Sequence, residues 1–278
     1  MLSGGVYALL AAGFALILGS LRLLNLAHGS LLVVAMAGAW ALAAWFEVDP
    51  YASLPLLTLL MFAAGWGVFR WFIGPVSRAW GSLGGTLATL ALALVVDGSA
   101  RLLLGSAPRG IDMSYALSLV PIGPYLLPLP KVVGFAGAGG LGFVLWLFMA
   151  QTDTGRSIQA VAQDADGARL VGIRPERMHA LAYGVGTGCL GAAACLLLPS
   201  APLVTDAGPR FLLLAATGAA LGGFGHLGGA VAGGLALGVV EAVSDAVLPS
   251  GGAAVVCAAL LGATVLFRTM TRLQPARA

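Results

Sequence analysis

Three polar side chains interrupt the apolar N-terminal part of the chain within a few positions of one another. Arg22, Asn25 and His28 all fall in the stretch LRLLNLAHGSLL, and Asn25 is the only asparagine in the protein. A polar group in apolar surroundings costs free energy unless it is hydrogen-bonded or reaches water. Two roles fit this placement. Asn25 can cap a helix that begins near Leu26, with His28 reaching back to the free backbone donors, or both side chains can line a path for a polar solute.

Four more polar side chains are candidates for such a path. Thr86 and Thr89 share one face of a predicted helix, Thr217 lies in a short apolar segment, and Glu241 has no obvious base beside it. The hydroxyl groups can instead bond to backbone carbonyls of their own helix. The carboxylate can face water or bind the amino group of a zwitterion. Each of these residues therefore has a structural role and a pathway role open to it.

The chain lacks the residue sets that are typical of enzymes. No serine or cysteine is paired convincingly with a histidine or an acid in helical register, and the three cysteines lie in apolar runs, where they fit packing roles. No cluster has the spacing of metal ligands, and no G-x-x-x-x-G-K-S/T phosphate loop is present. Asp97 and Arg101, four positions apart, are expected to neutralise each other. We expect no metal, no cofactor and no enzymatic activity.

The composition is that of an integral membrane protein. The chain is 59% hydrophobic and only 9% charged, with a mean hydropathy of +0.98, whereas soluble domains are about 25% charged. Continuous apolar runs exclude a membrane β-barrel, whose strands alternate, and predict one all-α domain, residues 1–278, built as a polytopic bundle of eight or nine transmembrane or re-entrant helices. The runs are residues 2–21, 29–46, 50–69, 79–96, 132–152, 180–205, 211–240 and 246–267.

The run 211–240 is too long for one span and is interrupted by GGFGHLGG. We expect a short segment, spanning or re-entrant, that ends near Phe224, and a second helix from about Gly228. Gly225, Gly229 and Gly233, spaced by four, indicate close helix packing, either within the chain or against another subunit. The proline-rich residues 105–131 predict an irregular loop.

Residues 151–179 form the longest charged stretch, and they indicate how the chain is oriented across the membrane. If this loop is cytoplasmic, most arginines fall on its side, as the positive-inside rule requires, and the C-terminus is cytoplasmic too; the other side receives Arg101, Arg109, Lys131 and Arg210. Helical spacing predicts one amphipathic helix over residues 157–171, capped by Thr154 and ended by Gly172, before a new helix restarts at Pro175. The result is a protruding elbow.

Three collinear motifs resemble one transporter family. They are NLAHG at residues 25–29, GRSIQAVAQDADGARLVGIRPERMHALAYGVG at 155–186 and GGFGHLGGAVAGGLALG at 222–238. Together they are similar to the inner-membrane permease subunit of branched-chain amino acid ABC importers. The resemblance implies a bacterial inner-membrane protein that moves branched-chain or other small amino acids, or a related solute such as urea or an amide.

The resemblance also implies partners. These are two cytoplasmic ATPase subunits that bind the ATP, a second related permease or a second copy of this chain, a periplasmic substrate-binding protein, and membrane lipid, but no nucleic acid. The elbow resembles the family's ATPase-coupling loop, which would assign coupling to Gly155, Arg156, Asp164, Ala168, Gly172 and Ile173. The alternative is an ion-coupled secondary transporter or channel, whose sites lie at broken helices; the scarcity of carboxylates within the apolar runs disfavours it.

Overall fold

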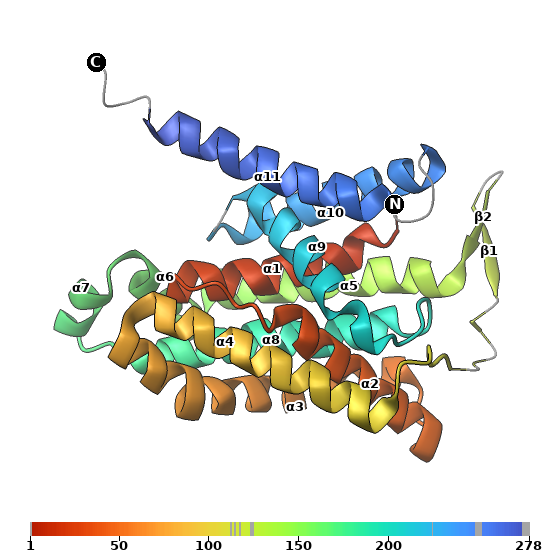
Figure 1. The fold of residues 1–278 in the computed structure, drawn as a ribbon, viewed down its shortest axis with the longest axis horizontal. Coiled ribbons are helices and arrows are strands. Elements are labelled where there is room, and N and C mark those ends of the chain that lie inside the picture. Colours follow the sequence, from red (N-terminus) through yellow and green to blue (C-terminus); the bar gives the residue numbers. More distant parts are fainter. Residues whose placement is uncertain are drawn as a thin grey trace.

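The computed structural model is a bundle of long helices with a small hairpin at one end and two short helices at the other (Figure 1). It describes residues 2–111, 113, 115–116, 118–122, 125–223, 225–247 and 252–273. The elements are α1 (Gly4–Leu21), α2 (His28–Phe46), α3 (Pro50–Val68), the π-helical turn η1 (Phe69–Ile73), α4 (Gly74–Leu104), β1 (Leu119–Ile122), β2 (Tyr125–Pro128), α5 (Leu129–Gln151), α6 (Asp153–Gln163), α7 (Ala165–Leu170), α8 (Pro175–Leu197), the 3-10 turn η2 (Thr205–Ala207), α9 (Gly208–Gly222), α10 (Leu227–Val247) and α11 (Gly252–Leu273).

The prediction of an all-helical membrane bundle is confirmed. Among the described residues, seven stretches are long and apolar enough to cross a membrane, and one of them, Pro50–Leu104, contains both α3 and α4. α9 has only 15 residues, or about 22 Å of helix, which is shorter than the roughly 30 Å hydrocarbon core. The short segment is therefore too short for a straight span. Its expected end, Phe224, lies outside the described residues.

α1 and α8 form the centre of the bundle. In the most apolar 18-residue stretch of each helix, 83% of α1 and 89% of α8 is buried, whereas only 11% of α11 is buried. α8 packs against α1, α2 and α3, and α1 also packs against α9 and α10. A side chain at Gly13 of α1 would press on the Gly186 carbonyl of α8, so small residues allow the two central helices to approach closely.

Two glycines of α10 pack closely against other helices of the chain. Gly233 lies against Gly218 of α9, and Gly234 lies against Ala8 of α1, so closely that neither glycine has room for a side chain. Close backbone approach gains dispersion contacts that lipid does not otherwise provide. Of the two interpretations that the sequence leaves open, the structure supports intrachain packing for these positions.

The prediction of an irregular loop after α4 is wrong in part. β1 and β2 pair antiparallel, with Leu119 opposite Pro128 and Val120 opposite Leu127. Each strand of a two-stranded ribbon has an open edge, so a proline there need not remove a ladder hydrogen bond. We call this end of the bundle the hairpin end, and the opposite end the elbow end, because α6 and α7 project there (Figure 1).

Candidate functional site

Residues 22–27, between α1 and α2, are not helical, and they lead the chain back into the bundle. Arg22 ends α1 in the left-handed conformation with a φ of 53°. His28, the first residue of α2, lies 3.2 Å by its Nε2 from the carbonyl oxygen of Leu10, halfway along α1. Leu10 and Arg22 are separated by about 18 Å of helix, at about 1.5 Å per residue. α2 therefore begins deep inside the bundle, and the segment before it is non-helical backbone at membrane depth.

Two threonines of α4 form hydrogen bonds with this non-helical backbone. Thr86 Oγ1 accepts a hydrogen bond from the Leu24 amide at 3.3 Å, and Thr89 Oγ1 accepts one from the Leu26 amide at 3.1 Å. The Thr89 hydroxyl also donates its one hydrogen to two carbonyl oxygens, that of Leu24 at 3.0 Å and that of Thr86 at 2.7 Å. Non-helical backbone is tolerated at this depth only when such partners or a watery cavity are present.

The expectation that Asn25 caps α2 is wrong. The helix begins at His28 rather than near Leu26, and its N-cap residue is Ala27 with no side-chain cap. The Asn25 side chain instead turns to α8, where its Oδ1 accepts a hydrogen bond from the Tyr183 hydroxyl at 3.2 Å. Both side chains are fully buried. Asn25 Nδ2 and His28 Nδ1 are buried and have no hydrogen-bond partner in the described part of the chain.

Two of the six pathway candidates have their polar partners outside this cluster. Thr217 of α9 donates to the Leu213 carbonyl at 2.7 Å, which is the local role that hydroxyls in helices commonly take. Glu241 of α10, expected to lack a base, forms an ion pair with Arg210 of α9 at 3.0 Å. Asn25, His28, Thr86 and Thr89 therefore form the candidate site, and a pathway role for Thr217 and Glu241 stays a prediction.

The expected ion pair between Asp97 and Arg101 is also wrong. Arg101 Nε lies 2.6 Å from Asp206 Oδ1, at the start of the η2 turn. The side chains of the pair are both more than half exposed, so the interaction contributes little to stability. It nevertheless ties α4 to the connection that leads from α8 into α9.

The elbow consists of two helices rather than the one predicted over residues 157–171. Thr152, not Thr154, caps α6 by accepting from the Gly155 amide at 3.0 Å. Asp164 then interrupts the helix, because its Oδ1 accepts from the amides of Asp166 and Gly167, both at 3.0 Å, and so starts α7. An aspartate that bonds to the amides following it favours a helix start over a helix interior.

α6 is fastened to α5 at its start and to Arg22, the residue that ends α1, at its last turn. Gly155 packs on the Phe148 and Met149 backbone without room for a side chain, and Arg156 Nε donates to the Ala150 carbonyl at 3.3 Å. Arg22 donates to the last carbonyls of α6, those of Ala162 and Gln163. The predicted coupling residues Gly155 and Arg156 thus lie at the base of the elbow rather than at its tip.

The tip of the elbow exposes apolar side chains. Leu170 is 90% and Val171 is 76% exposed, and they precede Gly172, whose φ of 86° makes the turn toward α8. Ala168 is buried, and its carbonyl accepts from the Ile173 amide at 3.0 Å, which closes the turn. Arg169 links Asp166 at 3.2 Å to Glu176 at 3.1 Å and so holds α7 against the first turn of α8.

The sequence interpretation missed three features of these sites. Tyr183, the partner of Asn25, lies within the motif LAYGVG but gives no sign of its contact across the chain. Arg210 is far in sequence from Glu241. Leu170 and Val171 could have been found, because they form an apolar pair at the end of an otherwise charged stretch, directly before a glycine.

The fold and these sites define a multi-pass membrane protein with an unwound polar segment at its centre and a helical elbow at one end. The chain belongs to the family described as "Branched-chain amino acid transport system / permease component", which matches residues 1–270. This is a family of transport permeases rather than of enzymes. No solved structure matches the chain.

Several curated relatives are similar over most of the chain. The high-affinity branched-chain amino acid transport system permease protein BraD of Pseudomonas aeruginosa is 28% identical over 95% of this chain and 90% of its own length. The corresponding protein LivH of Escherichia coli K12 is 29% identical over 93% of this chain and 88% of its own. The autoinducer 2 import system permease protein LsrC of Escherichia coli is 30% identical over 64% of this chain and 50% of its own.

Proposed function

We propose that the chain is the permease subunit of an ATP-binding-cassette importer that carries branched-chain or other small amino acids across the bacterial inner membrane. One observation carries this proposal: the α6–α7 elbow, with its exposed apolar tip, is hydrogen-bonded through Arg22 to the start of the unwound segment. Family membership and the names of BraD and LivH support the same assignment.

In this proposal the elbow end is cytoplasmic, two ATPase subunits power the importer, and the elbow docks in a cleft on the ATPase. Leu170 and Val171 supply an apolar contact for the ATPase, and Gly172 and Asp164 set the shape that fits it. The ATPase subunits bind the ATP, and this chain needs no cofactor. Arg70 and Arg78 lie at the same end as the elbow, as the positive-inside rule requires. α11 runs back toward that end, which supports a cytoplasmic C-terminus (Figure 1).

The unwound segment supplies the transport path. Movement of the elbow acts on Arg22, and through it on Asn25 and His28, because only six positions separate Arg22 from the start of α2. Packed helices shift between discrete arrangements rather than deforming continuously, so this linkage can alternate access to the centre. The unpaired Asn25 Nδ2 and His28 Nδ1 are the atoms that we assign to the polar groups of the substrate.

The remaining partners complete the pathway on the hairpin side. A second permease, either a related chain or another copy, forms the other wall, and a periplasmic binding protein delivers the substrate. Glu241 is neutralised by Arg210 in this account and serves packing between α9 and α10, while the Thr217 hydroxyl bonds to the Leu213 carbonyl of α9 and lies 3.4 Å from the Cys257 carbonyl of α11.

Uptake by membrane vesicles tests the proposal. Vesicles that contain this chain, the ATPase subunits, the second permease and the binding protein should accumulate leucine, isoleucine or valine only when ATP is supplied inside the compartment where the elbow lies. A panel that includes urea and small amides defines the substrate class. Uptake by this chain alone, driven by a proton or sodium gradient, would instead establish the ion-coupled alternative, which unwound helices also suit.

A further inference from the structure

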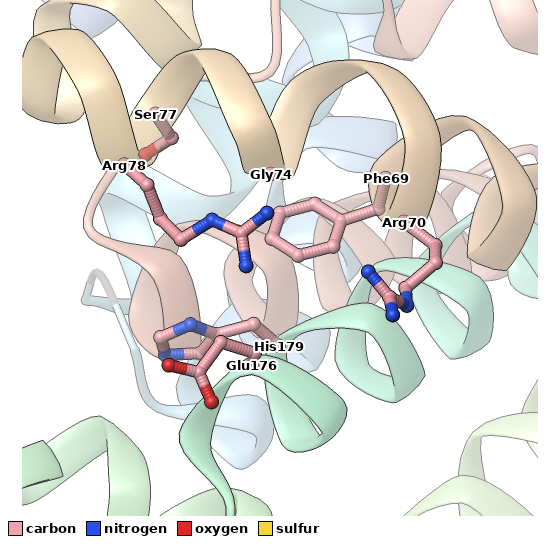
Figure 2. Close-up of a pocket in the computed structure, with 7 residues that line it drawn as sticks. All are labelled: Phe69, Arg70, Gly74, Ser77, Arg78, Glu176 and His179. Atoms are coloured by element: carbon pink, nitrogen blue, oxygen red, sulfur yellow. The ribbon is translucent and has the colours of Figure 1, made fainter.

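A small pocket opens at the elbow end, between the α3–α4 turn and the start of α8. Figure 2 shows Arg70 from η1 and Arg78 from α4 on one side, and Glu176 and His179 from the first turns of α8 on the other. The Arg78 guanidinium extends across the opening toward Glu176 and His179. The residues that line the pocket include none of the unwound segment and none of the exposed tip of α7.

The pocket carries an excess of positive charge. In the part of the chain that the structure describes, neither Arg70 nor Arg78 forms a side-chain hydrogen bond or a close ion pair. The one carboxylate of the pocket, Glu176, is engaged by Arg169 at 3.1 Å. Two exposed guanidinium groups therefore face the opening with their donors available. The planar donor set of a guanidinium matches the oxygens of a phosphate group.

The residues around the pocket place it at the level of lipid headgroups. Trp71 directly follows Arg70 and is 75% exposed, and Trp80 lies two positions after Arg78 and is 80% exposed. Tryptophan is enriched at the boundary between the hydrocarbon core and water, where its apolar ring and its N–H are both accommodated. Two exposed tryptophans close in sequence to two arginines that form no close ion pair indicate, on a membrane bundle, contact with headgroups rather than with bulk water.

We propose that this pocket binds the phosphate group of an anionic phospholipid, such as phosphatidylglycerol or cardiolipin, from the leaflet at the elbow end. Arg70 and Arg78 hold the phosphate oxygens, the Ser77 hydroxyl lines the same opening and adds a donor, and Trp71 and Trp80 lie along the acyl chains below the headgroup. Basic pockets between membrane helices bind anionic headgroups in this way. The inference does not depend on which solute the protein transports.

Lipid binding by the purified full chain tests the proposal. The chain is delipidated in neutral detergent and titrated with phosphatidylglycerol or with phosphatidylcholine, and bound lipid is counted by native mass spectrometry. Each arginine near an anionic headgroup strengthens binding about five-fold. The double variant Arg70→Gln/Arg78→Gln should therefore bind phosphatidylglycerol about twenty-five-fold more weakly, with its weak binding of phosphatidylcholine unchanged.

Control variants separate the pocket from general charge. Arg177→Gln removes an exposed arginine beside Glu176 that does not line the pocket, and it should change phosphatidylglycerol affinity less than two-fold. If the double variant does not fold, Arg78→Lys takes its place in the test. This variant keeps the charge and should retain part of the affinity for phosphatidylglycerol. Equal phosphatidylglycerol binding by wild type and Arg78→Gln would overturn the proposal. Displacement of the lipid by inorganic phosphate at equal concentration would also overturn it and assign the pocket to a soluble anion.

Discussion

The Arg22 guanidinium donates a hydrogen bond to the Gln163 carbonyl at 3.2 Å and another to the Ala162 carbonyl at 3.3 Å. These carbonyls belong to the last turn of α6, where backbone oxygens lack helical partners and carry partial negative charge. Arg22 is at once the end of α1 and the beginning of the unwound segment. A single side chain thus joins the elbow to the centre of the bundle.

Replacing Arg22 with alanine should uncouple transport without unfolding the protein. Its side chain is exposed, so the loss of its hydrogen bonds should lower the free energy of unfolding by only about 1 kcal/mol. ATP-driven uptake should nevertheless fall at least about ten-fold, while ATP hydrolysis by the reconstituted complex continues, since α6 no longer pulls on the unwound segment. Arg177→Ala, at an exposed arginine without this contact, is the matched control. Unchanged uptake in Arg22→Ala would show that the contact does not transmit motion.

Thr89→Val should destabilise the unwound segment. Valine has nearly the shape of threonine but neither accepts the Leu26 N–H nor donates to the Leu24 carbonyl, and those groups are left without partners at membrane depth. Each buried unsatisfied group costs about 1–3 kcal/mol. Thermal unfolding in detergent should show a clear loss for Thr89→Val and little change for Thr89→Ser, which keeps the hydroxyl. Equal melting temperatures of Thr89→Val and Thr89→Ser would show that the hydroxyl does not stabilise the unwound segment.

The Asn25 and Tyr183 pair can be separated into folding and transport roles. Tyr183→Phe removes one hydrogen bond and should cost about 1 kcal/mol of stability. Asn25→Leu should insert into the membrane at a normal level but lose uptake, because it also removes the Nδ2 group assigned to the substrate. A double-mutant cycle measured by thermal unfolding should give a coupling of about 1 kcal/mol. Failure of Asn25→Leu to insert would indicate that the residue serves folding alone.

Glycine substitutions should divide sharply by position. An alanine at Gly29 would overlap the Gly208 carbonyl, where the first turns of α2 and α9 meet, whereas the space beside Gly98 of α4 is open. Gly29→Ala should therefore reduce the yield of folded protein severely. Gly98→Ala should be neutral or raise stability by up to about 1 kcal/mol, because alanine loses less backbone entropy in a helix. Similar folded yields for the two variants would contradict the close contact of α2 with α9.

Periodicity and composition predict the helices of this protein well because the membrane demands long apolar runs. They also bring Thr86, Thr89, Asn25 and His28 forward as candidates, since polar side chains stand out against that background. Local patterns do not reveal how deep a chain segment lies. The capping role expected for Asn25 was wrong because α2 begins inside the bundle, where a tyrosine from α8 competes for the side chain.

Partners that are distant in sequence account for the other errors. Arg101 pairs with Asp206 and Glu241 pairs with Arg210, and no spacing rule relates either pair. The elbow was predicted as one helix because its apolar positions keep helical spacing, but the Asp164 side chain bonds to the amides that follow it and divides the helix. The β1–β2 hairpin was missed because its prolines favour a loop in any reading of the local sequence.

The most direct test is the amount of amino acid transported per ATP hydrolysed by the reconstituted complex, measured for the wild type, Gly172→Pro and Asp164→Arg. Proline cannot adopt the φ of 86° at Gly172, and arginine at position 164 removes the cap that starts α7. We predict that both variants insert normally and hydrolyse ATP, yet transport at least about ten-fold less substrate per ATP. A ratio equal to that of the wild type in both variants would contradict the assignment of the elbow to ATPase coupling.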